Sequence, residues 1–181
     1  MTTRTHDSAF LDGRRTGPVR GFLRRVVAGG AIAGALAALA ACGGFQPSPT
    51  SLDITITANE TLNPNSENQS SPVIVRVYEL KSLSAFNQAT MFDLIDNDTK
   101  VLGADLIGRE DMEIKPGETK TIKKDTAPET RFIGVMAGFR DLDSAVWRAQ
   151  TNVVKEKTNV ITVTLTALAV TVSSKAHGRL F

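Results

Sequence analysis

Cysteine and histidine, on which many catalytic and metal sites depend, are scarce in this 181-residue chain. There is one cysteine, Cys42, and there are two histidines, His6 and His177, which lie near the two ends of the sequence. A single thiol excludes an intrachain disulfide. Because no histidine lies in the body of the chain, the sequence predicts neither a Ser-His-Asp arrangement nor a zinc site of histidine and cysteine ligands.

Phosphate-binding loops are missing too, since neither G-x-G-x-x-G nor P-loop spacing occurs after Cys42. Carboxylates at 96–98 and 110–113 could act as acid–base groups or calcium ligands, but their spacing fits no calcium loop, and we interpret them as solvated turn charges. The stretch from Phe139 to Arg148 is either a recognition patch or, as we favour, arginine paired with neighbouring carboxylates. We therefore predict a binding protein and not an enzyme, with no catalytic residues and no metal.

What the sequence does contain is a clear pattern before Cys42. Five arginines between residues 14 and 25 precede an uncharged stretch of 16 residues, Val26 to Ala41. This pattern is typical of a secretory signal peptide, and it is short for a transmembrane anchor, which needs about 20 apolar residues. Cleavage between Ala41 and Cys42 is typical of bacterial lipoproteins. We predict a signal peptide over 1–41, diacylglyceryl and acyl lipid on Cys42, and no other cofactor.

Removal of the signal peptide changes the charge of the chain. Residues 1–41 hold 6 of the 21 basic and 2 of the 19 acidic side chains, so 15 basic and 17 acidic ones remain, a net charge of −2. The basic character of the whole chain belongs to the signal, and we expect no nucleic-acid binding. Residues 42–50, rich in glycine, proline and serine, indicate a flexible tether.

Alternating apolar residues after position 50 predict strands. Ser51 to Ala58 reads as a half-buried strand and Val73 to Leu80, apolar on both faces, as a central one. Further strands are expected over 119–124 (an edge strand), 132–139 (buried), 145–151 (with Trp147 in the core), 159–165 and 168–172. A turn is expected at 115–118, and a tight turn or a bulge near Thr166-Ala167. Seven or eight short strands indicate an all-β fold, a two-sheet β-sandwich over 51–173 with a frayed tail over 174–181.

Two connections stand out from this strand pattern. Residues 81–89 are expected to be irregular, and Thr90-Met91-Phe92-Asp93 resembles a capping box, which predicts one short helix packed on the sandwich. The connection after the first strand is a polar surface loop, long for two strands and therefore a candidate binding segment. Its residues are Asn59, Glu60, Thr61, Leu62, Asn63, Pro64, Asn65, Ser66, Glu67, Asn68, Gln69, Ser70, Ser71 and Pro72.

The order of several motifs resembles a known family. These motifs are Cys42, the strand from Pro72 to Lys81, Ala85-Phe86, Pro116-Gly117-Glu118, Arg131 to Val135, Phe139-Arg140-Asp141 and Trp147-Arg148. Together they resemble the type VI secretion system outer-membrane lipoprotein family, TssJ, over nearly all of Cys42 to Val172. The resemblance implies a transthyretin-like β-sandwich with a helical insertion, on the periplasmic face of the outer membrane.

The resemblance also implies partners. Members of this family hold the periplasmic domain of the inner-membrane protein TssM, which forms a membrane complex with TssL, and the contact lies largely in the loop between the first two strands. By position that loop is Asn59 to Pro72 here. We therefore expect an outer-membrane anchor for TssM, with no small-molecule substrate. The alternative is a lipid-anchored periplasmic carrier of a small ligand, which would need an apolar pocket.

Overall fold

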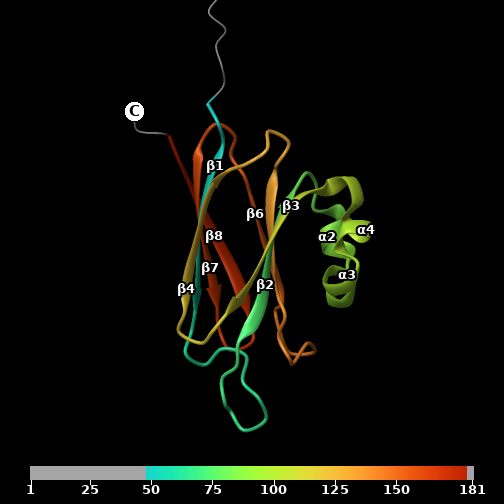
Figure 1. Cartoon of the computed structure of the whole chain (residues 1–181), viewed down its shortest axis with the longest axis vertical. Coiled ribbons are helices and arrows are strands. Elements are labelled where there is room, and N and C mark those ends of the chain that lie inside the picture. Colours follow the sequence, from blue (N-terminus) through green and yellow to red (C-terminus); the bar gives the residue numbers. More distant parts are fainter. Residues whose placement is uncertain (1–47, 179–181) are drawn as a thin grey trace, which may run out of the picture. The chain divides into compact units, whose positions relative to one another are not determined.

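The computed structural model describes residues 48–178, and within them eight strands form two four-stranded sheets (Figure 1). The strand orders are β4-β1-β7-β8 and β3-β2-β5-β6. The strands are β1 (Ser51–Ala58), β2 (Val73–Leu80), β3 (Leu106–Ile114), β4 (Thr119–Asp125), β5 (Phe132–Ala137), β6 (Arg148–Asn152), β7 (Thr158–Leu165) and β8 (Val170–His177). The prediction of an all-β, transthyretin-like sandwich is confirmed. The predicted signal peptide, Cys42 and most of the tether lie outside the described residues.

The positions of β1, β2 and β4 within the sheets agree with the sequence pattern. β1 pairs with β4 on one side and, in parallel, with β7 on the other, which brings Ile54 opposite both Ile122 and Ile161. β4 therefore has no neighbour on its other side in this sheet, as its polar sequence predicts. β2 lies between β3 and β5, which is the central place expected for a strand that is apolar on both faces.

The two faces of β2 belong to two different hydrophobic clusters. Val73, Val75 and Val77 are buried between the sheets, among aliphatic side chains from β1, β5 and β7. Tyr78 and Leu80 point the other way and are buried beneath the helical insertion. Because side chains alternate along a strand, a single eight-residue segment supports both layers of the core.

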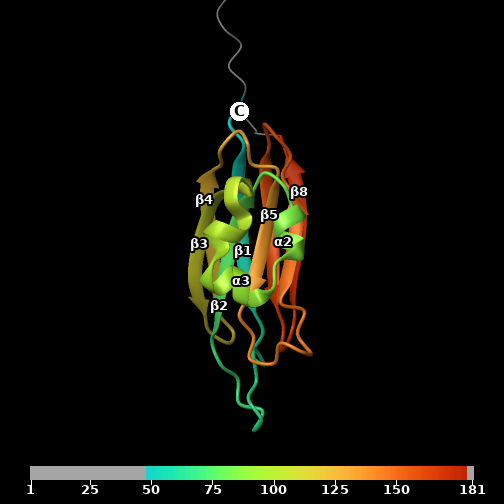
Figure 2. The ribbon, with the colours of Figure 1, turned by 90° about the vertical axis from the view of Figure 1, so that its right-hand side faces the viewer.

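The helical insertion, residues 84–105, is larger than predicted. It contains α2 (Ser84–Gln88), α3 (Met91–Asp96), α4 (Asp98–Leu102) and a 3-10 turn, η1 (Gly103–Asp105), and it covers the outer face of the β3-β2-β5-β6 sheet (Figure 2). The capping box is confirmed at α3, where the Thr90 and Asp93 side chains each accept from the other's backbone N–H. The prediction that residues 81–89 are irregular is wrong, because α2 occupies most of this stretch.

The position of α2 depends on a close approach that its own sequence does not reveal. The ring of Phe86 is fully buried, and its edge meets the ring of Tyr78 with centroids 5.8 Å apart. Phe86 also lies directly over Gly134 of β5, where an added Cβ would stand 2.9 Å from Cζ of the ring. Glycine at 134 therefore makes room for the phenyl ring, and tertiary packing holds a five-residue helix that would not form alone.

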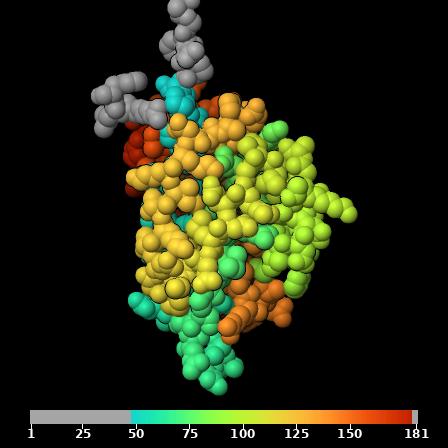
Figure 3. Space-filling model, viewed as in Figure 1, coloured from blue at the N-terminus to red at the C-terminus, as the bar shows by residue number. Residues whose placement is uncertain are grey.

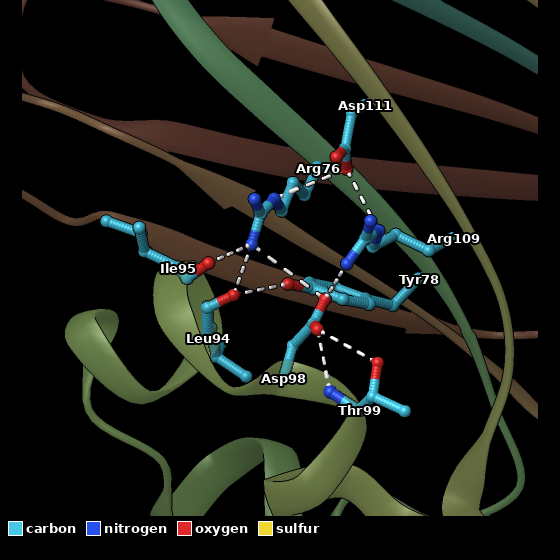
Figure 4. Close-up of polar contacts among 8 residues, drawn as sticks. All are labelled: Arg76, Tyr78, Leu94, Ile95, Asp98, Thr99, Arg109 and Asp111. Carbon is cyan, nitrogen blue, oxygen red and sulfur yellow. Dashed lines mark hydrogen bonds and ion pairs between the residues drawn. The ribbon is translucent and has the colours of Figure 1, made fainter.

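A network of charged side chains fastens α3 and α4 to the sheet (Figure 4). The Asp98 carboxylate, whose side chain is 6% exposed, accepts from Arg109 Nη1 at 2.7 Å and lies 3.8 Å from Arg76 Nη1. Arg76 also donates to the backbone carbonyls of Leu94 and Ile95 at the end of α3. The interpretation of Asp98 as a solvated turn charge is therefore wrong: this carboxylate joins the insertion to β2 and β3.

Two groups of this network have shifted pKa values. Burial would raise the pKa of Asp98, but the hydrogen bonds from Arg109 and from the backbone N–H of Thr99, together with the charge of Arg109, outweigh burial and hold this pKa below its ordinary value. Burial raises the pKa of Tyr78 to about 12. The hydroxyl of Tyr78 therefore stays protonated and donates to the carbonyl of Leu94 at 3.2 Å.

In the C-terminal part of the sandwich, one sequence-based prediction is confirmed, two need correction and one holds in part. A turn at 166–169 connects β7 to β8, closed by Thr166 N–H donating to Ala169 O at 2.8 Å, which confirms the turn predicted there. β8 then continues to His177, so the prediction of a frayed tail is wrong for residues 174–177, which pair with β7. The strand expected over 145–151 begins only at Arg148. Trp147 packs against both clusters but is only partly buried, so the prediction that it lies in the core holds in part.

The two ends of the sandwich carry different connections (Figure 1). The described chain begins at residue 48 beside the start of β1, and the connections 126–131 and 153–157 lie at the same end. We call this the tether end. The connections 59–72, 115–118, 138–147 and 166–169 lie at the opposite end, which we call the loop end. Eight residues of β1 separate the two ends by about 26 Å.

No helix in residues 48–178 is long and apolar enough to cross a membrane.

The contribution of Asp98 to stability can be tested by Asp98→Asn. Loss of the charge weakens the bonds to Arg109 and Arg76, and we expect the free energy of unfolding at pH 7 to fall by about 1.5–3 kcal/mol. A lowered pKa in the folded state stabilises the fold above the unfolded value, about pH 4, and this stabilisation is lost as pH falls through the folded pKa. The difference between the variant and the wild type should therefore shrink below pH 4 in urea denaturation.

The matched control is Asp96→Asn, two residues away on the same insertion. Asp96 is exposed and makes no side-chain hydrogen bond or ion pair within the described part of the chain. Its replacement should change the free energy of unfolding by no more than about 0.5 kcal/mol. Equal effects of the two substitutions would contradict the role assigned to Asp98.

Candidate functional site

The predicted binding loop, residues 59–72, connects β1 of one sheet to β2 of the other and projects from the loop end. Figure 3 shows it protruding beside the β5–β6 connection, residues 138–147. Of its 14 residues, Leu62, Asn63 and Ser71 are buried, and the others are exposed or half-buried. The prediction of a polar surface loop therefore holds for the tip, whereas the base of the loop belongs to the folded domain.

The base of the loop is held by Asn63, which is 2% exposed. Its backbone N–H donates to Ala167 O at 2.9 Å, and its side-chain amide donates to Pro72 O at 3.0 Å. Its side-chain oxygen accepts from the backbone N–H of Arg140 at 2.9 Å. Asn63 has a φ of +48°, a conformation that asparagine tolerates better than most residues. One side chain thus joins loop 59–72 to the β5–β6 connection, and its backbone joins the loop to the β7–β8 turn.

The tip of the loop is closed by its own hydrogen bonds. The side-chain oxygen of Asn65 accepts from the backbone N–H groups of Glu67 and Gln69, each at 2.9 Å. The backbone N–H of Asn65 donates to Gln69 O at 3.0 Å, and that of Asn68, at φ +60°, donates to Asn65 O. The side chains of residues 66–70 remain exposed. Asparagine side chains commonly close turns in this way, so the asparagine-rich sequence produces an ordered tip.

Two neighbouring connections complete the loop end. The turn at 115–118 is confirmed: Gly117 adopts φ +74° and donates its N–H to Asn59 O at 3.3 Å. In the β5–β6 connection, the carboxylate of Asp141 accepts from the backbone N–H of Ser144 at 3.2 Å. A hollow of about 470 Å³ lies between this connection and the loop tip. It is lined by Pro64, Asn65, Ser66, Arg140, Asp141 and Leu168.

The candidate recognition patch between Phe139 and Arg148 divides into two parts. Arg140 is exposed at the loop end, and its side chain makes no ion pair in the region that the structure describes. Arg148 instead donates to the carbonyls of Phe86 and Ala89, at 3.0 and 2.8 Å, and lies over the Trp147 ring. The expected pairing with a carboxylate is therefore wrong for both arginines, and Arg148 fastens α2 instead. Sequence alone gives no signal for this, because backbone carbonyls are acceptors in every residue.

The carboxylates at 110–113 lie on a strand and not on a turn. They belong to β3, where Asp111 is 3.3 Å from the Nε atoms of both Arg76 and Arg109, and Glu110 is 3.1 Å from Lys124 Nζ. Within residues 48–178, no group of three or more histidine, cysteine, aspartate or glutamate side chains is placed to hold a metal ion. What the loop end offers is an ordered surface of polar side chains, suited to contact with another macromolecule.

This chain is similar to known proteins in sequence and in fold. Residues 50–168 match the model of a family described as type VI secretion lipoprotein, VasD, EvfM and TssJ. The crystal structure of the T6SS lipoprotein TssJ1 from Pseudomonas aeruginosa is 36% identical, with a TM-score of 0.67, and the alignment covers 73% of this chain and 99% of that one. No curated protein matches the chain in sequence.

Two further structures show the same fold. A chain in a structure described as a type VI membrane complex is 23% identical, with a TM-score of 0.60 over 70% of this chain and 99% of that one. A chain in a structure described as the TssM C-terminal domain from EAEC is 22% identical, with a TM-score of 0.57 over 68% and 98%. The family match and the 36% identity go beyond fold, and on both grounds this chain belongs to the TssJ family of type VI secretion lipoproteins.

Proposed function

We propose that this lipoprotein anchors the periplasmic domain of the inner-membrane protein TssM to the outer membrane, within a complex that also contains TssL. Membership of the family makes the chain a membrane-associated component of type VI secretion. The proposal adds that lipid on Cys42 holds the domain at the periplasmic face of the outer membrane and that loop 59–72 contacts TssM. It includes no enzymatic activity.

One observation carries the proposal: the ordered loop 59–72 lies at the end of the sandwich opposite to the one where the chain arrives from Cys42. Residues 42–50 can span at most about 30 Å, so a lipid on Cys42 keeps the tether end near the membrane. The loop end is separated from the tether end by about 26 Å, so it can reach that much farther from the membrane. This arrangement presents the loop to a protein that reaches across the periplasm.

The loop end is structurally ordered, and this supports a role in binding. Binding loses less free energy when the contact surface is already ordered, since fewer side chains and backbone segments must be immobilised. Here Asn65 closes the tip and Asn63 fixes the base. The alternative, a carrier of a small ligand, gains no such support, because the space between the sheets is filled by aliphatic side chains such as Ile54, Val75 and Val163.

Removal of the loop tip tests the contact directly. Replacing Asn65–Gln69 by two glycines leaves Asn63 and its bonds in place, and we expect retention of the TssM periplasmic domain in a pulldown to be lost. The control replaces Pro128 and Glu129, at the tether end, by two glycines. Undiminished retention by the tip variant, with an intact control, would remove the loop from the proposed interface.

The positioning role of Asn63 can be separated from its backbone conformation. Asn63→Gly permits the positive φ but leaves the N–H of Arg140 and the carbonyl of Pro72 without their partner. We expect the free energy of unfolding to fall by about 1–3 kcal/mol. The affinity for TssM should fall as well, and the Arg140 amide should exchange faster with deuterium. Unchanged exchange at Arg140 would show that Asn63 does not hold the two loops together.

Anchoring by lipid can be tested by Cys42→Ala. One acyl chain gives only marginal membrane binding, about 10⁴ M⁻¹, whereas several chains make it stable. The variant should appear in the soluble periplasmic fraction, folded but unable to support secretion. Ser48→Ala, which leaves the lipid site intact, should remain with the outer membrane. A Cys42→Ala protein that still fractionated with the outer membrane would refute the anchor.

A further inference from the structure

The loop end and the tether end of the sandwich differ in charge. The four connections of the loop end hold five acidic and two basic side chains, a net charge of −3: Glu60, Glu67, Glu118, Asp141 and Asp143 against Lys115 and Arg140. Residues 48–50, 126–131 and 153–157 of the tether end hold two acidic and three basic ones, a net charge of +1: Glu129 and Glu156 against Arg131, Lys155 and Lys157. Of these two sets of connections, the set at the end that bears the candidate binding loop carries the negative charge. Residues 81–105, which include the helical insertion, hold four acidic and two basic side chains of their own, on the outer face of the β3-β2-β5-β6 sheet.

The acidic side chains of the loop end are not equally available. The carboxylate of Glu118 accepts from the backbone N–H of Lys115 at 2.8 Å and lies 3.6 Å from Lys120, so it belongs to the turn. Glu67, Asp141 and Asp143 are exposed, and none of the three forms an ion pair among residues 48–178. No ion pair within residues 48–178 neutralises their charge.

The loop architecture fixes the positions of these three carboxylates, which form no ion pair within residues 48–178. Glu67 lies in the tip that Asn65 closes, and Asp141 and Asp143 lie in the connection that Asn63 ties to the same loop. Asp141 also lines the hollow beside the tip. At about 470 Å³ this hollow has room for a side chain from another molecule. Charges held on an ordered surface can select the orientation in which a partner docks.

On these grounds we propose that the loop end docks a basic face of a partner protein, with lysine or arginine side chains meeting Glu67, Asp141 and Asp143. This inference rests on the function proposed above and adds the chemistry of the partner surface. The charge argues against the other two occupants. An anionic lipid surface would repel this end, and a second copy of the chain would bring two acidic ends together.

Complementary charge acts mainly on the rate of association. Steering by opposite charges raises association rates by about 10-fold to 1,000-fold at low salt, and the effect falls steeply as salt is added. Arg140 and Lys115 are the two basic side chains of this surface, and Arg140, exposed beside the hollow, opposes a basic partner. Removing the carboxylates should therefore slow association, and reversing Arg140 should accelerate it.

The experiment measures the association rate of the unlipidated mature chain with the purified TssM periplasmic domain, at low and high salt. The loop-end pair is Glu67→Lys with Asp143→Lys. It spares Asp141, whose carboxylate holds Ser144, and its matched control is Glu129→Lys with Glu156→Lys at the tether end. We expect the loop-end pair to slow association at least tenfold at low salt, the control to change it less than twofold, and Arg140→Glu to raise it. High salt should remove these differences.

The outcomes separate this inference from the function on which it rests. If wild type binds TssM and removal of the tip abolishes binding, but the loop-end pair associates as fast as wild type, the basic face is refuted and the loop contact stands. If wild type does not bind TssM, both fail. Co-sedimentation of wild type with phosphatidylglycerol vesicles, lost in the tip variant, would assign the loop end to lipid and overturn the proposal.

Discussion

Burial of β2 on both faces is the constraint on which the rest of the domain depends. Its valines fill the space between the sheets, while Tyr78 and Leu80 form the floor on which the helical insertion packs. Arg76, on the same face, binds the carbonyls at the end of α3 and shares Asp98 with Arg109. Because one strand supports both layers, the insertion is part of the folded domain, and it covers the outer face of the sheet and not the loop end.

The loop end is ordered by asparagine. Asn63 connects three chain segments that are remote in sequence, and Asn65 closes the tip without help from the sandwich. A long polar loop held at its base can present charged side chains in fixed positions, which favours selective contact over adaptable contact. In the proposed function, the lipid on Cys42 holds one end of the sandwich, and this loop contacts the partner at the other end.

Sequence patterns that span only a few residues predicted much of this structure. Alternation identified β1, β2 and β7, and the capping box identified α3, because both signals lie within one turn or one strand. The helix α2 was missed because Phe86 is held by Tyr78 and by the space over Gly134, neither of which is near it in sequence. The interpretation of Asp98 as a solvated turn charge fails for the same reason, since its partners lie on β2 and β3, outside the insertion in sequence. The end of β8 was missed because Ser173 to Ala176 lack alternating apolar residues and are held by pairing with β7.

By itself the sequence determined the fold class, the family resemblance and the place of the long loop, because periodicity, composition and motif order need no coordinates. Only the tertiary structure decided that Asn63 joins that loop to the β5–β6 connection, and that the loop and the start of the described chain, residue 48, lie at opposite ends of the sandwich. It also placed Glu67, Asp141 and Asp143 at the same end of the sandwich. Hydrogen bonds and electrostatic interactions depend on the distance between atoms in space. Asn63 and Arg140 are 77 positions apart in the chain, and they become neighbours only when the two sheets pack together.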